Sequence, residues 1–221
     1  MDQWPFIYSN EPVAFNNEQM KFRPFYVLYG LNWLRQVLLK KQRNPTQIRE
    51  GNMADNPLEW ILARRSIRKF HSNPVEDEKI DLMLQAAMAA PSAHNARPWH
   101  FIVVQDRQVL NRLADIHPYA KMCYEATLAI VVCADPAIAK DFWPQDCSAA
   151  TQNILLAGTS LGLGTVWIGI HPKAKRKDPV KQLFSIPDDM EALSVVAVGY
   201  PAEKKESRTQ FDAARVHHEA W

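Results

Sequence analysis

Three arginines fall within five residues of the chain, in the run Arg64-Arg65-Ser66-Ile67-Arg68. Guanidinium groups bind phosphate and carboxylate in bidentate geometry, and a serine hydroxyl adds a further donor. The run follows a predicted helix, and cations at a helix C-terminus also offset the helix dipole without binding any ligand. The run is therefore a candidate anion site, and a solvated basic helix end is the simpler interpretation of these five residues alone.

A second polar segment, residues 91–98, is bracketed by Pro91 and Pro98 and contains Ser92 and Asn95. Each proline ring fixes its own φ and pushes the preceding residue toward extended geometry, which leaves a rigid loop. A rigid loop holds hydroxyl, amide and backbone groups where they can contact a flat polar ligand edge. The alternative is an ordinary helix-to-strand connection made of turn-forming residues.

Glycines punctuate the run from Leu161 to Ile170, at Gly162, Gly164 and Gly169. Glycine permits a tight turn and close approach of a ligand to the backbone. The spacing is not G-x-G-x-x-G, and the chain contains no G-x-x-x-x-G-K-[ST] motif. These absences disfavour a doubly wound dinucleotide-binding fold. The basic patch Lys173–Lys177 that follows is interpreted as solvated.

Hydrophobic periodicity indicates the elements that must position these segments. The methionines and alanines before Pro91 recur at helical spacing, and continuous apolar runs indicate buried strands. We expect an α+β fold with a small mixed or antiparallel sheet covered by helices. The expected elements, in order, are helices starting at Asn56-Pro57 and Asn73-Pro74, a strand over Phe101–Gln105, a helix over Arg107–Ala114, a strand over Leu128–Ala134, a helix over Pro144–Ser160, a strand after Gly164, a helix, and a strand over Leu193–Tyr200.

The length of 221 residues suits one domain, or one domain with an appendage, and 47% hydrophobic with 23% charged residues is typical of a soluble globular protein. The three cysteines, Cys123, Cys133 and Cys147, form no C-x-x-C pair and have no histidine spacing that would indicate zinc. They are typical of reduced, buried thiols in a cytosolic protein. The sequence therefore predicts a cytoplasmic protein with no metal site.

Residues 1–52 differ from residues 53–221 in charge. The first segment has seven Lys/Arg and four Asp/Glu, a net +3, and the rest has nineteen and twenty, a net −1. The nearly neutral body gives no electrostatic case for nucleic acid. Residues 25–41 form a basic amphipathic helix candidate that is too short to span a bilayer. Its pattern fits membrane or partner contact, and we do not expect membrane contact. The extension 1–52 is otherwise an adventitious tail, or translated upstream sequence before a native start at Met53.

Four motifs occur in order and together resemble the FMN-dependent nitroreductase family, in its short branch. They are the Arg64–Arg68 run, the segment Pro91–Phe101, the glycine run Leu161–Gly169, and Val198-Gly199-Tyr200-Pro201 before a basic tail. The resemblance covers about residues 55–221. It implies the nitroreductase-like α+β fold and a homodimer with two FMN sites at the subunit interface.

The resemblance also implies a set of FMN contacts, residue by residue. The first motif implies that Arg64, Arg65, Ser66 and Arg68 contact the phosphate, ribityl chain and pyrimidine edge, and the tail's phosphate contacts match Lys205 and Arg208 loosely because the spacing there varies. The second and third motifs imply Ser92 and Asn95 near the pyrimidine, Pro91 and Ala93 along the flavin, and the backbone of Ile168, Gly169 and Ile170 facing flavin N5.

Two positions depart from the family pattern. Arg97 replaces a common glutamine, which puts a polar contact there in doubt, and Gly169 replaces a glutamate found in some members, so only a main-chain role transfers. Asp146 and Gln152 on the long predicted helix either reach the partner's site or serve as a helix cap and a dimer contact.

The resemblance implies an NAD(P)H:acceptor oxidoreductase. FMN would carry the redox chemistry, NADH or NADPH would reduce it, and the acceptors would be nitroaromatics, quinones or similar compounds in a ping-pong sequence, with no side-chain catalyst. One alternative is a flavoenzyme of the same fold with other chemistry, namely dehalogenation, dehydrogenation or flavin fragmentation. The other is a membrane- or partner-binding protein with a vestigial domain.

Overall fold

The computed structural model describes residues 58–221, which fall within one compact unit. The predicted amphipathic helix over 25–41, the proposed start at Met53 and the predicted cap at Asn56 and Pro57 lie outside the described residues. Whether residues 1–52 belong to the native protein therefore stays a prediction.

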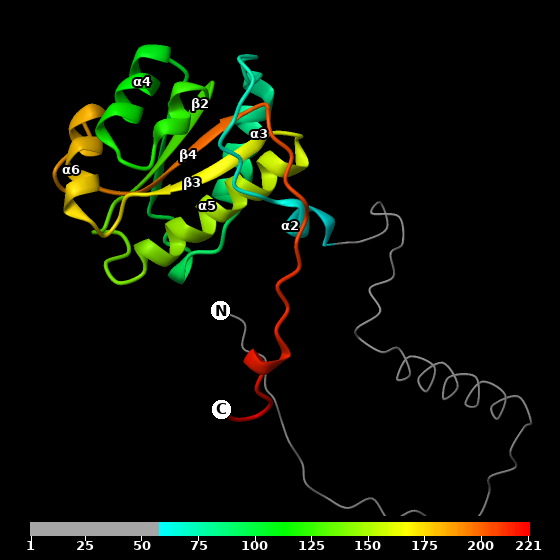
Figure 1. Ribbon diagram of the computed structural model, residues 1–221. Coiled ribbons are helices and arrows are strands. Elements are labelled where there is room, and N and C mark those ends of the chain that lie inside the picture. The colour runs from blue at the N-terminus through cyan, green and yellow to red at the C-terminus, as the bar shows by residue number, and fades with distance from the viewer. Residues whose placement is uncertain (1–57) are drawn as a thin grey trace, which may run out of the picture. The chain divides into compact units, whose positions relative to one another are not determined.

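The centre of the fold is a four-stranded antiparallel sheet with strand order β1-β2-β4-β3 (Figure 1). Its strands are β1 (Trp99–Val104), β2 (Leu128–Ala134), β3 (Gly164–Gly169) and β4 (Glu191–Gly199). β1 and β3 form the two edges. The predicted α+β class and antiparallel sheet are confirmed.

Helices cover both faces of the sheet, and the side chains of β2 show why. Ala129, Val131 and Cys133 pack in a core with helices α4 (Arg107–Ile116) and α6 (Ala174–Leu183). The alternate residues Leu128 to Ala134 pack in a second core with α3 (Asp77–Met88) and α5 (Trp143–Ser160). Because both faces of β2 are buried, its sequence is a continuous apolar run rather than an alternating one.

Local signals mark the starts of two helices, α4 and α5. The Asp106 carboxylate accepts a hydrogen bond from Val109 N at 2.9 Å and caps α4. Pro144 lies in the first turn of α5, as the sequence predicts. The second helix was predicted to start at Asn73-Pro74, which is wrong, because α3 starts at Asp77. The residues between stay extended and bury Val75 in the core.

Helix α2 (Glu59–Ala63) does not bury the apolar face that its sequence indicates. Leu58, Trp60 and Ile61 are 51%, 63% and 55% exposed. With only five residues, this helix presents an apolar surface that the described part of the same chain does not cover. Large exposed apolar patches are typical of protein interfaces.

The three cysteines are free and buried. Burial raises the pKa of Cys123, Cys133 and Cys147 to about 12, so each is a neutral thiol at physiological pH. This confirms the expectation of reduced, buried thiols. Among residues 58–221, no helix combines the length and apolar character that crossing a membrane requires.

Candidate functional site

The first predicted motif crosses the sheet where β3 and β4 meet. Ile67 N donates to Thr165 O at 2.9 Å. Phe70 forms an isolated antiparallel β-bridge with Pro201, just after β4. Gly164 and Gly199 are cross-strand partners beneath this crossing. A Cβ on Gly164 would lie 2.7 Å from Ile67, and one on Gly199 would lie 3.0 Å from Phe70. The two glycines therefore make the room that lets residues 64–70 cross.

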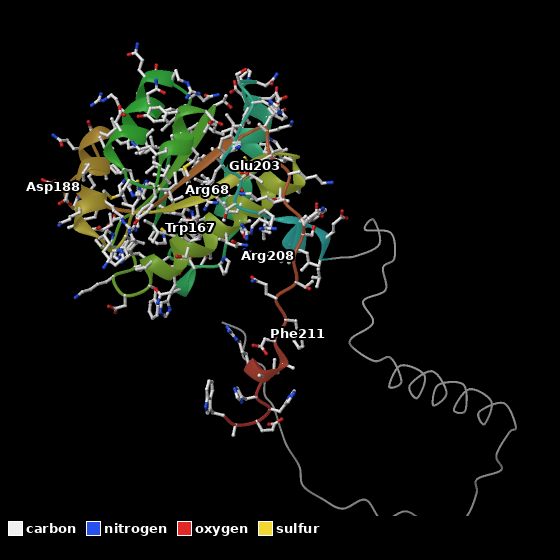
Figure 2. All side chains as sticks on the ribbon, viewed as in Figure 1. Arg68, Trp167, Asp188, Glu203, Arg208 and Phe211 are labelled. Atoms are coloured by element: carbon white, nitrogen blue, oxygen red, sulfur yellow. The ribbon has the colours of Figure 1, made fainter. Side chains whose placement is uncertain are left out.

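The C-terminal tail runs back along the same motif. Figure 2 shows Arg208 on this extended tail and Arg68 on the segment that crosses the sheet. Hydrogen bonds join the tail to the motif and to the end of α2: Arg68 N to Glu203 Oε1 at 2.5 Å, Lys205 Nζ to Ser66 O at 2.6 Å, Ala202 N to Lys69 O at 2.9 Å, Arg208 N to Leu62 O at 3.3 Å, and Arg65 Nη1 to Glu206 O. The bonds in this set that involve a side chain join residues 135 to 141 positions apart in sequence, so only the tertiary structure brings these two segments together.

Three arginines of these segments lie close enough to repel one another. The pKa of Arg64 is lowered by burial and, after that, by the positive charges of Arg208 and Arg65. Within residues 58–221 no carboxylate forms an ion pair with any of the three, since Glu203 pairs with Lys205 at 3.1 Å instead. An anion bound here would relieve the repulsion, so the cluster is a candidate anion-binding site.

The open edge of β3 adjoins this cluster. Thr165 points its carbonyl outward to Ile67, so in an antiparallel pair Trp167 and Gly169 also turn their N–H groups outward. Ile168 faces β4, and Ile170 N donates to Leu193 O at 3.1 Å. Of the three predicted backbone positions, Gly169 is therefore the one whose N–H faces the open edge.

A hollow of about 370 Å³ lies at this edge, and no carboxylate lines it. A Cβ built on Gly169 would meet nothing within 4 Å, so a flat group can approach the backbone there. The lining residues are Arg68, Pro118, Tyr119, Lys121, Met122, Val166, Trp167, Ile168 and Gly169.

Arg176 and the buried His117 lie close to the Gly169 peptide. Arg176 Nη1 donates to Gly169 O at 3.4 Å. His117 is fully buried, and its Nδ1 accepts from Tyr119 N at 3.3 Å, which leaves the proton of the neutral ring on Nε2. The sequence pattern missed Arg176, which belongs to the basic patch interpreted as solvated. No spacing signal within one chain segment connects it to Gly169.

His117 should make the stability of the fold depend on pH. Its pKa is lowered from 6.5, first by burial and second by Arg176. Below pH 6.5 the unfolded chain therefore binds a proton that the folded chain resists, and stability falls by at most about 1.4 kcal/mol per pH unit. Urea unfolding at pH 7.5, 6.5 and 5.5 should show a steeper loss in the wild type than in His117→Gln. Equal slopes would contradict this role of His117.

The predicted loop around Ser92 is rigid, as expected, but it lies elsewhere. His94, Asn95 and Arg97 have φ of 53°, 55° and 51°, a region that non-glycine residues rarely adopt. Two hydrogen bonds maintain it: Arg97 N to Ser92 Oγ and Ala93 N to Asp146 Oδ1, both at 3.0 Å. Asp146 is buried in the first turn of α5, so its contact is with the loop of its own chain.

One chain does not bring the second motif to the first. The loop enters β1, at the edge opposite β3, and β2 and β4 lie between the two edges. Three strand spacings separate the edges by about 14 Å. Ser92 and Asn95 therefore lie apart from Gly169 and from the arginine cluster. Gln152 is half-buried on α5.

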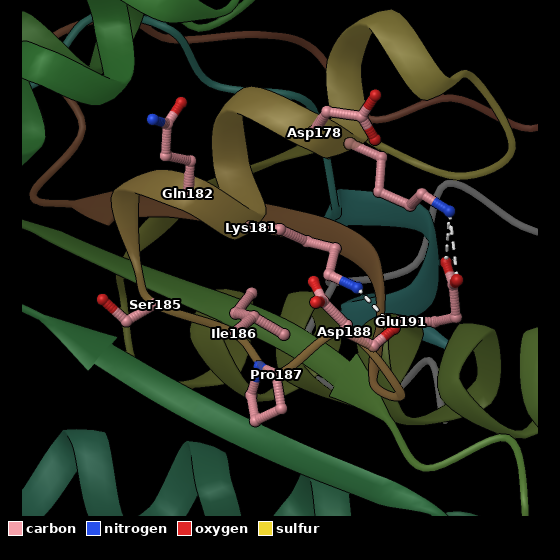
Figure 3. A pocket seen from close by; sticks show the side chains of 9 residues that line it. Asp178, Lys181, Gln182, Ser185, Ile186, Pro187, Asp188 and Glu191 are labelled. Atoms are coloured by element: carbon pink, nitrogen blue, oxygen red, sulfur yellow. Dashed lines mark hydrogen bonds and ion pairs between the residues drawn. The ribbon is translucent and has the colours of Figure 1, made fainter.

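A larger hollow of about 610 Å³ lies between α6 and the turn into β4 (Figure 3). It contains none of the predicted site residues, and its charges are mixed. Lys177 pairs with Glu191 at 3.0 Å, and Lys181 Nζ donates to the carbonyls of Asp188 and Met190. Because these cations already have partners, this hollow is a poor anion site.

The fold and the site define a class of protein: an α+β domain that presents unneutralised arginines and an outward backbone N–H beside the edge of its sheet. The model of the nitroreductase family matches residues 61–121 and 116–200. A protein of Methanothermobacter thermautotrophicus, provisionally named NADH dehydrogenase/NAD(P)H nitroreductase, is 50% identical over 166 residues, which are 74% of this chain and 87% of the relative.

Two solved structures are similar as well. One, provisionally named NADH dehydrogenase/NAD(P)H nitroreductase, is from Bacteroides thetaiotaomicron, with a TM-score of 0.73, 44% identity and coverage of 77% of this chain and 99% of that one. Another, from Desulfovibrio desulfuricans, is a provisionally named nitroreductase in complex with FMN, with a TM-score of 0.66, 30% identity and coverage of 76% and 99%. The chain belongs to the nitroreductase family, which confirms the predicted family and fold.

Proposed function

We propose that the protein is an FMN-dependent NAD(P)H:acceptor oxidoreductase. The observation that carries the proposal is the cluster of Arg64, Arg65 and Arg208, whose charges repel one another and lack carboxylate partners within residues 58–221. A phosphate group would supply the missing negative charge. The FMN complex of the Desulfovibrio protein supports FMN as the group that carries it, and the name of the Methanothermobacter relative supports NAD(P)H as the reductant.

The residues beside the cluster fit the rest of such a cofactor. Ser66 and Arg68 follow directly along the chain and lead from the arginines to the hollow at Gly169. Lys205 binds Ser66 O and Glu203, so it holds the motif in place as well as adding positive charge. We assign Arg64, Arg65 and Arg208 to the phosphate, and Ser66 and Arg68 to the ribityl chain and pyrimidine edge.

The outward N–H of Gly169 would donate to flavin N5, with Ile168 and Ile170 holding the strand on either side. When bound, FMN would supply hydride acceptance and electron transfer, the chemistry that amino acid side chains lack. The protein's part is orientation and electrostatics. Arg68 and the Gly169 N–H place positive charge and a donor where reduction adds electron density, and no side-chain acid or base is required.

A homodimer completes the site in this proposal. Ser92 and Asn95 cannot reach Gly169 within one chain, because β2 and β4 intervene. A second copy can supply its loop, so we assign Pro91, Ser92, Ala93 and Asn95 of the partner subunit to the flavin. The uncovered apolar side chains Trp60, Ile61 and Phe211, which is 81% exposed, provide surface for the dimer interface.

Nitroaromatics, quinones and similar electron-poor compounds are the proposed acceptors. An open hollow over one flavin face would admit NAD(P)H and the acceptor in turn, which predicts ping-pong kinetics. The free, buried thiols agree with the proposed cytoplasmic location, and the nearly neutral body with the absence of a nucleic-acid partner.

The visible spectrum of the purified protein tests the proposal. The protein should take up FMN, lose the oxidised-flavin absorption on anaerobic addition of NADPH or NADH, and regain it when a quinone or nitroaromatic is added. A colourless protein that does not take up FMN would overturn the cofactor assignment. A bound flavin that NAD(P)H does not bleach would favour another chemistry on the same fold.

A further inference from the structure

A second hollow continues from the one at Gly169. It has a volume of about 480 Å³ and shares Pro118 and Tyr119 with the first. Its other lining residues are Lys173, Ala174, Lys175 and Arg176, from the start of α6. The two hollows therefore form one continuous surface that extends from the edge of β3 to the start of α6.

The charge of this surface is one-sided. Five cationic residues line the two hollows and no carboxylate does; they are Arg68, Lys121, Lys173, Lys175 and Arg176. The hollow in Figure 3 is larger, but Asp178, Asp188 and Glu191 balance its two lysines. Size therefore does not distinguish the two regions, and charge does. Of these two regions, the surface beside Gly169 is the one that suits a ligand with several negative charges.

The cations of the second hollow are available to a ligand to different degrees. Arg176 lies over the Tyr119 ring, 4.9 Å from its centroid, and also contacts Gly169 O. Arg176 and Tyr119 together form the boundary between the two hollows. Tyr119 itself is 62% exposed. Lys173 and Lys175 are exposed, and in the part of the chain that the structure describes neither forms an ion pair.

We propose that the second hollow, through Lys173, Lys175 and Arg176, binds the phosphate groups of the reducing dinucleotide and makes the enzyme prefer NADPH to NADH. The proposal rests on the proposed function. A nicotinamide that stacks on a flavin held at Gly169 would lie beside the first hollow, so the rest of its dinucleotide must leave along a neighbouring surface. The 2′-phosphate of NADPH adds negative charge where the cations outnumber the carboxylates three to none.

Isothermal calorimetry with 2′,5′-ADP tests the site without any turnover. The FMN-loaded protein should bind 2′,5′-ADP more tightly than 5′-ADP, and the double variant Lys173→Gln, Lys175→Gln should bind it about tenfold more weakly, because two exposed charge contacts are lost. The difference in 2′,5′-ADP affinity between the wild type and the double variant should shrink in high salt. Arg112→Gln is the matched control, since Arg112 is exposed on α4 and lines neither hollow. No binding of 2′,5′-ADP, or equal binding by the double variant, would overturn the proposal.

Rapid-reaction kinetics separate this proposal from the proposed function. The double variant should need about tenfold more NADPH for half-maximal flavin reduction. The NADH concentration needed for half-maximal reduction should rise less. Reduction by 1-benzyl-1,4-dihydronicotinamide, which has no phosphate, should match the wild type. If no dihydronicotinamide reduces the wild-type flavin, the proposed function fails. If all three reductants act equally on variant and wild type, only the phosphate site fails.

Discussion

The double variant Arg64→Gln, Arg208→Gln should bind FMN at least about 100-fold more weakly than the wild type. Hydrogen bonds between guanidinium and phosphate contribute about 1.5–3 kcal/mol each, and about 1.4 kcal/mol corresponds to a factor of ten in affinity. The two arginines lie together at the crossing of residues 64–70 with the C-terminal tail. Glutamine keeps much of the length and polarity of arginine and removes only the charge and the fork of donors.

Apoprotein stability distinguishes ligand binding from structural support in this variant. The pKa of Arg64 is lowered by burial and by Arg208 and Arg65, so its charge is unfavourable in the folded apoprotein. Removing the charge should therefore leave the free energy of unfolding of the apoprotein unchanged or raise it. Fluorescence titration with FMN and urea unfolding measure the two properties, with Arg112→Gln as control. Lost stability with unchanged FMN affinity would show that the arginines support the fold instead.

The second large effect is expected from Gly164→Ala. The new methyl group would lie 2.7 Å from Ile67 Cγ2 and 2.9 Å from its Cβ, so the crossing segment must move. Overpacking of this kind costs about 1–3 kcal/mol of stability. Because Ile67 lies between Ser66 and Arg68, the same displacement should also weaken FMN binding. Unlike the arginine variant, this one should lose stability and cofactor affinity together.

Gly169→Ala is the matched control on the same strand. A Cβ there meets nothing within 4 Å, so this variant should unfold within about 0.5 kcal/mol of the wild type. Urea unfolding of both apoproteins compares their stability, and FMN titration of Gly164→Ala against the wild type measures the change in cofactor affinity. Two results would contradict the close packing of residues 64–70 over Gly164. One is equal stability of Gly164→Ala and Gly169→Ala, and the other is an unchanged FMN affinity of Gly164→Ala.

Element positions were largely predictable because hydrophobic periodicity reports burial. The run Leu128–Ala134 was expected as a buried strand, and β2 has those bounds with every residue buried. The start of α3 was not predictable from Asn73-Pro74, because Val75 has a tertiary packing partner that outweighs the local helix-start signal. Trp60 and Ile61 of α2 are exposed, because an apolar pattern indicates burial but not which chain provides it.

The candidate site divides in the same way. The arginine run, the loop between Pro91 and Pro98 and the glycine run can be identified from the amino-acid sequence alone, because they are local properties of backbone and side-chain chemistry. The tertiary structure decided which of them meet. The strand order β1-β2-β4-β3 places Gly164 beside Gly199, admits residues 64–70 across them, and puts Ser92 at the opposite edge. It also brings Arg176 to Gly169 O and Arg208 to Arg64. Such contacts join distant segments, and no short-range pattern in a sequence encodes them.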